Sequence, residues 1–147
     1  MATISGGGKL EKALAEIAAK VKSAKTLRVG FLEGSTNTKD VSIPMYAAVN
    51  EFGAPSRGQP PRPFFRNFIA KYSPDWPKAL KGLLKGTDYD VNKSFEILGD
   101  VMEGELRQSI NDLVSPPLAA STIERKGFDK PLIDKSDMVN SVKHEIV

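Results

Sequence analysis

The sequence predicts an α+β fold: a small mixed or antiparallel sheet, one long helix packed across it, and several short helices. Three segments carry this prediction. Residues 26–32 and 141–147 alternate apolar and polar side chains, which is the period of a half-buried strand. Residues 90–114 place an apolar side chain every three or four positions, as in a helix with one buried face. We therefore expect the two strands to share one sheet with the long helix across it.

The composition is ordinary for a single globular domain. The chain has 147 residues, of which 40% are hydrophobic and 27% are charged. We expect residues 1–8, which include three consecutive glycines, to be flexible and residues 9–147 to form one domain. The net charge of +3 is well below that of a dedicated nucleic-acid binder. The chain has no cysteine, which excludes disulfides and thiolate metal sites, and no signal-peptide or membrane-spanning pattern is evident.

The first predicted helix covers residues 10–24, with Leu10, Leu14, Ile17 and Val21 on one face. The favoured interpretation is that this face packs on the domain's own sheet. The alternative is that it docks on a neighbouring subunit. The polar segment 33–42 after the first strand predicts a solvated loop or hairpin tip, which we prefer to a cation site at Glu33 and Asp40.

Two helices flank a proline-rich loop in the middle of the chain. Pro44 suits a first helical position, and Gly53 suits the residue that ends that helix. The expected buried face of the first of these helices consists of Met45, Ala48, Val49 and Phe52. The second is expected to start at Pro63 and to carry its apolar residues on one side, namely Phe64, Phe65, Phe68, Ile69 and Tyr72.

The loop between these helices is predicted to be stiff and basic. Its prolines restrict the backbone, and no acidic residue occurs between Glu51 and Asp75. Its characteristic residues are Pro60, Pro61 and Pro63 with Arg57, Arg62 and Arg66. Such a loop can present arginines to an acidic partner surface.

Another helix is expected to follow Ser73 as N-cap and to end at Gly86, with Trp76, Leu80, Leu83 and Leu84 buried. The long helix is expected to bury Val91, Phe95, Leu98, Met102, Leu106, Ile110 and Leu113. Its acids are expected on the opposite side, as a solvated face or as the complement of a basic surface: Glu96, Asp100, Glu103, Glu105 and Asp112. Gly99 and Gly104 predict a bend or a close approach of another backbone.

Catalytic patterns are missing from the sequence. It contains no nucleophile–base pair, phosphate-binding loop, dinucleotide fingerprint or metal-ligand spacing. The single histidine, His144, is expected at the surface or on an edge strand. The prediction is therefore a protein that is not an enzyme, with no cofactor and no catalytic or metal site.

Two blocks of the sequence resemble the tail-component (tail-completion, or neck) proteins of lambdoid tailed bacteriophages. The first joins Glu51-Phe52-Gly53 to Pro60-Pro61-Arg62-Pro63-Phe64-Phe65-Arg66. The second joins Pro131-Leu132-Ile133-Asp134 to Asn140-Ser141-Val142. The family usually has Thr-Gly after the aspartate, where this chain has Lys135-Ser136, so the turn there is expected to differ.

The resemblance implies a small α+β structural protein of virion assembly. Its partners would be copies of itself in a ring, six-fold in the virion, together with head-closure proteins and tail-tube or tail-terminator proteins. It would lie in the tail or neck of the virion after assembly in the host cytoplasm, with no membrane contact. The interface or motif residues would be Glu51, Phe52, Gly53, Arg57, Pro61, Arg62, Pro63, Phe64, Arg66 and Asp134.

Two alternatives remain open on the sequence. The chain can be a tail terminator or another minor tail protein, which the same surface would serve. It can also be a nucleic-acid-binding module, because Arg57, Arg62, Arg66 and Lys71 lie among the aromatic residues Phe64, Phe65 and Tyr72. In a neck ring, contact with DNA passing through the channel is a related expectation.

Overall fold

The computed structural model describes residues 7–22, 25–36, 41–113, 124 and 137–147. It confirms the α+β class. The strands β1 (Leu27–Phe31) and β2 (Val142–Ile146) pair antiparallel, with Leu27 opposite Ile146 and Phe31 opposite Val142. The strand that follows α1 and the C-terminal strand thus form one small sheet, as the alternating segments predicted.

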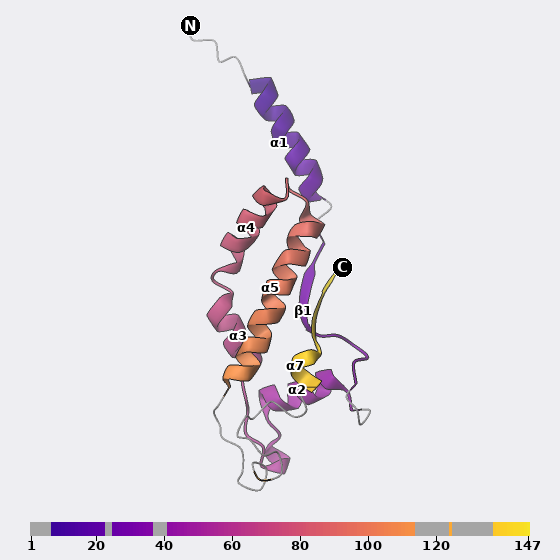
Figure 1. Cartoon of the computed structure of the whole chain (residues 1–147), viewed down its shortest axis with the longest axis vertical. Coiled ribbons are helices and arrows are strands. Elements are labelled where there is room, and N and C mark those ends of the chain that lie inside the picture. Colours follow the sequence, from indigo (N-terminus) through magenta and orange to yellow (C-terminus); the bar gives the residue numbers. More distant parts are fainter. Residues whose placement is uncertain (1–6, 23–24, 37–40, 114–123, 125–136) are drawn as a thin grey trace.

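The long helix α5 (Val91–Asp112) lies across this sheet. Two shorter helices, α3 (Phe64–Tyr72) and α4 (Trp76–Gly86), run along its other side (Figure 1). Elements therefore cover α5 from two directions. The buried set includes most of the predicted apolar residues, and it also includes Gly99 and Glu103 on the side of β2. Ser94 is buried as well, and it bonds to Thr87 in the connection between α4 and α5.

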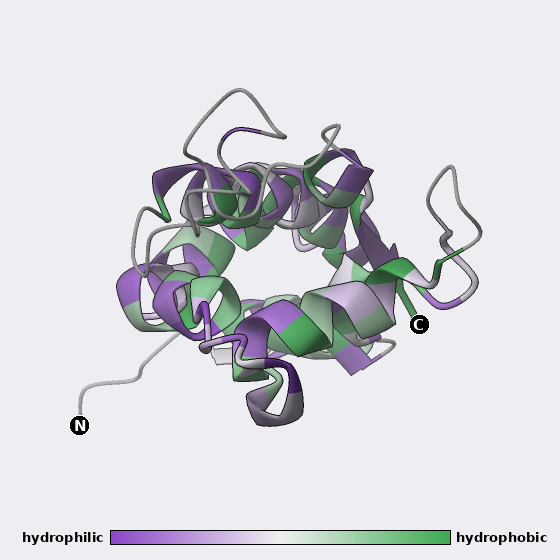
Figure 2. Ribbon diagram, turned by 90° about the horizontal axis from the view of Figure 1, so that it is seen from below, coloured by the Kyte–Doolittle hydropathy of each residue, from purple (hydrophilic) through white to green (hydrophobic). Residues whose placement is uncertain are grey.

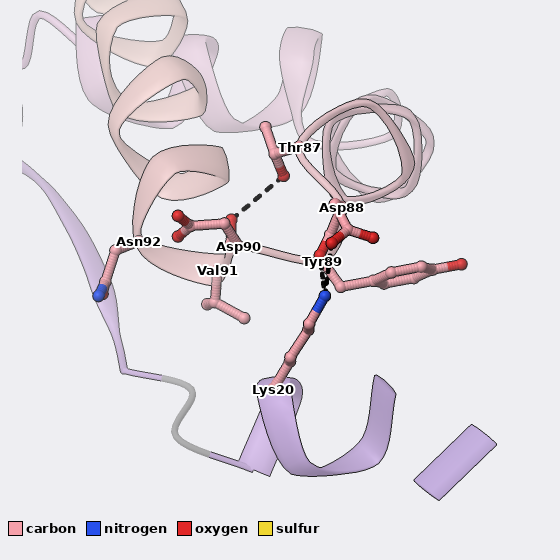
Figure 3. Close-up of a pocket in the computed structure, with 7 residues that line it drawn as sticks. All are labelled: Lys20, Thr87, Asp88, Tyr89, Asp90, Val91 and Asn92. Atoms are coloured by element: carbon pink, nitrogen blue, oxygen red, sulfur yellow. Dashed lines mark hydrogen bonds and ion pairs between the residues drawn. The ribbon is translucent and has the colours of Figure 1, made fainter. Parts of the chain in front are cut away.

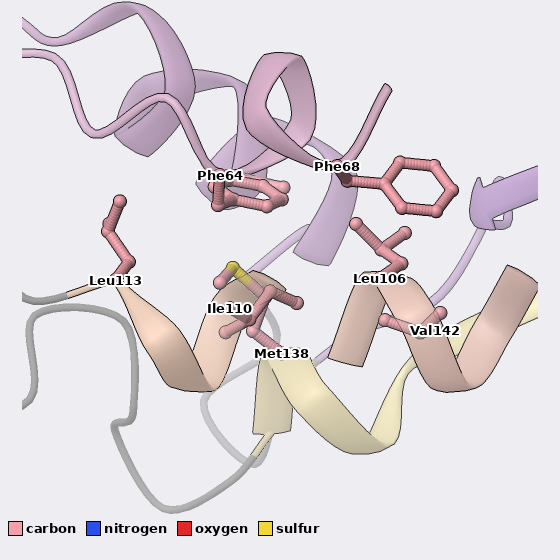
Figure 4. Packing of buried hydrophobic residues seen from close by; sticks show 8 residues of the cluster. Phe64, Phe68, Leu106, Ile110, Leu113, Met138 and Val142 are labelled. Atoms are coloured by element: carbon pink, nitrogen blue, oxygen red, sulfur yellow. The ribbon is translucent and has the colours of Figure 1, made fainter. Parts of the chain in front are cut away.

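The hydrophobic core lies where α3, α5, α7 (Asp137–Asn140) and β2 meet (Figure 4). Phe64 is 1% exposed and packs edge-on against Phe31, with ring centroids 6.0 Å apart. The buried cluster consists of Ala47, Phe64, Phe68, Leu106, Ile110, Leu113, Met138 and Val142. The core thus joins residues from the middle of the chain to residues near its C-terminus.

Helix α4 begins later than expected. Ser73 ends α3, because its backbone N–H donates to the Ile69 carbonyl, and it does not cap α4. The predicted apolar residues of α4 are half-buried, with none fully buried. Trp76 packs against Phe68, with ring centroids 5.2 Å apart, and its Nε1–H donates to Glu105 at 2.9 Å.

Helix α2 (Ile43–Phe52) buries a different face from the predicted one. Met45 is 64% exposed and Phe52 is 69% exposed, whereas Asn50 and Glu51 are buried. The reason is that the last turn turns its polar side chains inward, where they bond to backbone groups. The prediction of the α2 helix was therefore correct, and the prediction of its buried face was wrong.

Helix α1 (Gly7–Lys22) projects from one end of the molecule (Figure 1). It starts within the segment that we expected to be flexible. None of its residues is buried, so the favoured interpretation, packing on the domain's own sheet, is wrong. Figure 2, seen from below, shows that the helices carry both hydrophilic and hydrophobic residues.

Two smaller features complete the description. The predicted loop after β1 is closed by a bridge between Thr36 and Ser42. A single turn of 3-10 helix, η1 (Pro55–Arg57), lies in the proline-rich loop. Among the described helices, none is both long enough and apolar enough to cross a membrane.

Candidate functional site

The carboxylate of Glu51, at the end of α2, organises the motif region. It is buried, and it accepts hydrogen bonds from the backbone N–H groups of Phe65 (2.9 Å) and Arg66 (3.4 Å). Arg66 Nε donates to it at 2.6 Å, and Arg66 Nη2 donates to the Glu51 carbonyl at 3.1 Å. A carboxylate at a helix N-terminus satisfies unpaired N–H groups and the helix dipole. Glu51 therefore fixes the start of α3 against the end of α2.

Gly53 permits the chain to turn sharply after α2. Its φ is +76°, a region that side chains disfavour. A Cβ at this position would lie 2.8 Å from both the Gln59 carbonyl oxygen and the Pro61 nitrogen. Ala54 and Gln59 then exchange two backbone hydrogen bonds of 2.9 and 3.1 Å, which close the loop around η1.

Arg62 lies inside the protein. It is 8% exposed, its backbone N–H donates to the Asn50 carbonyl at 2.7 Å, and its Nε has no hydrogen-bond partner among the residues that the structure describes. Asn50 is held in turn, since its amide donates to the Tyr46 carbonyl and accepts from Gln59. Arg62 is thus part of the folded loop. The prediction that the loop presents this arginine to a partner was wrong.

The other predicted residues fall into exposed and internal groups. Arg57 is exposed and forms no ion pair with any described residue, while Pro61 is also exposed. Phe64 is core, and Pro63 is the half-buried N-cap of α3. Arg66 lies 5.9 Å from the Phe52 ring centroid, over its face. Asp134 lies outside the described residues.

A shallow apolar groove of about 250 Å³ opens beside this loop. Its walls come from α2, α3 and β1. The lining residues are Phe31, Pro44, Ala47, Ala48, Glu51, Phe52, Phe64, Phe65 and Arg66. The loop motif therefore shapes an apolar surface as well as a basic one.

A second polar centre, which the sequence analysis missed, holds the C-terminal strand on α5. Glu103 is buried and accepts from the backbone N–H of His144 at 2.9 Å, with His144 Nδ1 at 2.8 Å. Arg107 Nη2 donates to Glu103 at 2.6 Å and to the Val142 carbonyl at 2.8 Å. The i,i+4 spacing of Glu103 and Arg107 was the available signal.

The ionisation of this centre follows from its contacts. Burial alone would lower the pKa of His144, but hydrogen bonds and charge from Glu96 and Glu103 outweigh it and raise that pKa. Burial alone would raise the pKa of Glu103, but hydrogen bonds from His144 and Arg107 outweigh it and lower that pKa. Each group thus favours the charged form of the other.

Gly99 makes room for this centre. A Cβ on Gly99 would lie 2.4 Å from Cδ2 of His144, whereas a Cβ on Gly104 would meet nothing within 4 Å. The predicted close approach is thus found at Gly99, where a side chain and not a backbone comes close. His144 itself belongs to an edge strand, but its side chain is only 11% exposed.

The acids of α5 do not form one outer face. Glu103 points toward β2, and Glu105 accepts the Trp76 hydrogen bond. The exposed carboxylates are those of Glu96, Asp100 and Asp112. The prediction of a single acidic side was therefore wrong, because both long faces of α5 are covered.

Three side chains of kinds that can bind a metal ion lie close together, namely Asp100, Glu103 and His144. Glu103 and His144 already bind each other, and Arg107 occupies the second oxygen of Glu103. A guanidinium at that distance opposes a bound cation. The contacts support a structural role for this cluster.

A polar pocket of about 430 Å³ lies where α1 meets the rest of the molecule (Figure 3). Lys20 Nζ donates to the carboxylate of Asp88 at 2.5 Å and to its carbonyl at 3.1 Å. Asp88 and Tyr89 both have positive φ, at 52° and 61°, in the tight connection between α4 and α5. An exposed ion pair of this kind contributes at most about 1 kcal/mol, so it holds α1 only weakly.

No protein-family model, curated protein or solved structure matches this chain.

Proposed function

We propose that this chain is a structural subunit of a tailed-phage virion, a tail-completion protein that joins heads to tails as part of a neck ring. The observation that carries the proposal is the loop between α2 and α3. Its motif residues resemble those of the tail-component proteins, and contacts at Asn50, Glu51 and Gly53 tie the loop to the helices on either side of it. A rigid loop loses little conformational entropy on binding, which favours an assembly contact.

The charge of this region supports an acidic partner. Every charged side chain of residues 52–74 is basic, and Arg57 is exposed on η1. Arg66 and Lys71 are exposed too, although Arg66 is paired with Glu51. On a neighbouring copy, the exposed carboxylates of α5 are Glu96, which bonds to His144, and Asp100, and Arg57 could pair with an acid of this kind.

The nucleic-acid alternative is weaker. Phe64 is buried, and Phe65 and Tyr72 are half-buried within a series of aromatic contacts in the core. They are therefore poor stacking platforms for bases. A tail-terminator role would use the same loop and remains the nearest alternative.

The test is complementation of a phage that lacks this gene, using Arg57→Glu. We expect a folded protein, with unchanged circular dichroism, and free heads beside free tails in electron micrographs. The matched control is Lys78→Glu, the same charge change at an exposed position of α4, which should give normal particles. Normal infectious particles that contain the Arg57→Glu protein would show the proposal to be wrong.

A further inference from the structure

The starting observation is the bare apolar face of α1. Leu10 is 63% exposed, Leu14 is 56% exposed and Val21 is 36% exposed, with Ile17 half-buried on the same face. A helix of 16 residues is about 24 Å long and only marginally stable in water without packing. A face of this kind requires a cover that the described part of the chain does not supply.

An apolar surface of matching type lies at the other end of the molecule. On α2, Met45 and Phe52 are exposed, and the small Ala48 lies on the same face between them. The apolar groove beside Ala48 and Phe52 continues this surface toward Phe65. An alanine between two large side chains leaves a hole that a leucine from another helix can fill.

We propose that α1 of one copy lies on α2 of the next copy, with its leucines over Ala48 and the groove. This inference rests on the proposed function, since that function supplies further copies of the chain. The helix and the groove are at opposite ends of one molecule (Figure 1), so α1 does not cover its own groove. Two different surfaces of one chain that fit each other give a head-to-tail contact, which closes into a ring when the rotation permits.

The area of the α1 face, and not its charge, favours this contact. Arg57 and Arg66 lie next to the groove, and the α1 face is flanked by Glu11 and also by the lysines Lys9, Lys20 and Lys22. One helix face covers on the order of half of the roughly 800 Å² per partner that a stable pair of proteins buries. Two isolated copies should therefore associate weakly. In a ring each copy both donates and receives α1, which doubles the buried area per copy.

The chain has no cysteine, so single cysteines can report the contact directly. We would mix full-length Leu14→Cys with full-length Ala48→Cys and oxidise at high protein concentration. Docking should yield about tenfold more mixed disulfide dimer than Leu14→Cys with Ala79→Cys, an exposed alanine of α4. Leu10→Ser in the Leu14→Cys chain should abolish this excess while circular dichroism stays unchanged.

Three results would overturn the inference. The first is an equal yield of mixed dimer with Ala48→Cys and with Ala79→Cys. The second is a dominant Leu14→Cys homodimer, which would mean that α1 pairs with α1. The third is an intramolecular disulfide in a Leu14→Cys, Ala48→Cys double variant. Failure here, with Arg57→Glu behaving as expected in complementation, would remove this docking mode and leave the proposed function in place. Normal particles with Arg57→Glu would instead remove the proposed function.

Discussion

Helices α1 and α5 have the same kind of apolar spacing and opposite surroundings. Leu106 of α5 is 0% exposed, between α3 and the sheet, whereas Leu14 of α1 is 56% exposed. The spacing of apolar residues thus indicates that a helix has a face to cover. It does not indicate whether the cover comes from the same chain. Burial makes α5 part of the folding unit, whereas exposure leaves the α1 face open for the docking proposed above.

The same substitution in both helices tests this comparison most directly. Leu106→Ala should lower the free energy of unfolding by about 2–5 kcal/mol, because it leaves a cavity in the core. Leu14→Ala should change it by no more than about 0.5 kcal/mol, because its side chain is largely in solvent. Denaturant unfolding of both variants measures the two values. Equal losses would mean that α1 belongs to the folding unit.

Two glycines within α5 sharpen the comparison between a covered and a bare surface. Gly99→Ala should destabilise the protein by about 1–3 kcal/mol, since the new methyl group displaces the His144 ring from Glu103. Gly104→Ala meets open space and should stabilise the helix by about 1 kcal/mol. Thermal melts compare the pair. If Gly99→Ala were as stable as Gly104→Ala, the packing of His144 on α5 would be disproved.

The pH dependence of stability gives the smallest expected effect. The charged groups around His144 are Glu96, Asp100, Glu103 and Arg107 of α5, with Arg28 and Glu145 on adjoining positions of the sheet. Its folded pKa is raised, so its stabilisation is present below its unfolded pKa of about 6.5 and is lost as the pH rises through the folded pKa.

The measurement is the melting temperature of the wild type and of His144→Gln between pH 6 and pH 9. The wild type should lose more stability than the variant over this range. Glu103 behaves in the opposite way, because its folded pKa is lowered. Its stabilisation is fully present above the ordinary glutamate pKa of about 4.3 and is lost as the pH falls through the lowered folded pKa. Parallel curves for the two proteins would contradict a charged His144 in the fold.

The sequence determined the elements that depend on local patterns. Alternation predicted both strands of the sheet, and the three-and-four spacing predicted α5, because side-chain direction repeats with a fixed period in each structure. Gly53 as the end of α2 was also readable, because a positive φ favours glycine. The motif indicated that Glu51, Phe64 and Arg66 are important, but it did not predict which hydrogen bonds and packing contacts they make.

Only the tertiary structure decided which faces are covered. Met45 and Phe52 fit a buried stripe by spacing, yet Glu51 and Asn50 take the inner side of α2 because they satisfy backbone groups there. Arg62 is drawn inside by its place in the folded loop, and Glu103 by its partner His144, 41 residues away. Burial depends on contacts between residues distant in sequence, and a local period contains no information about them.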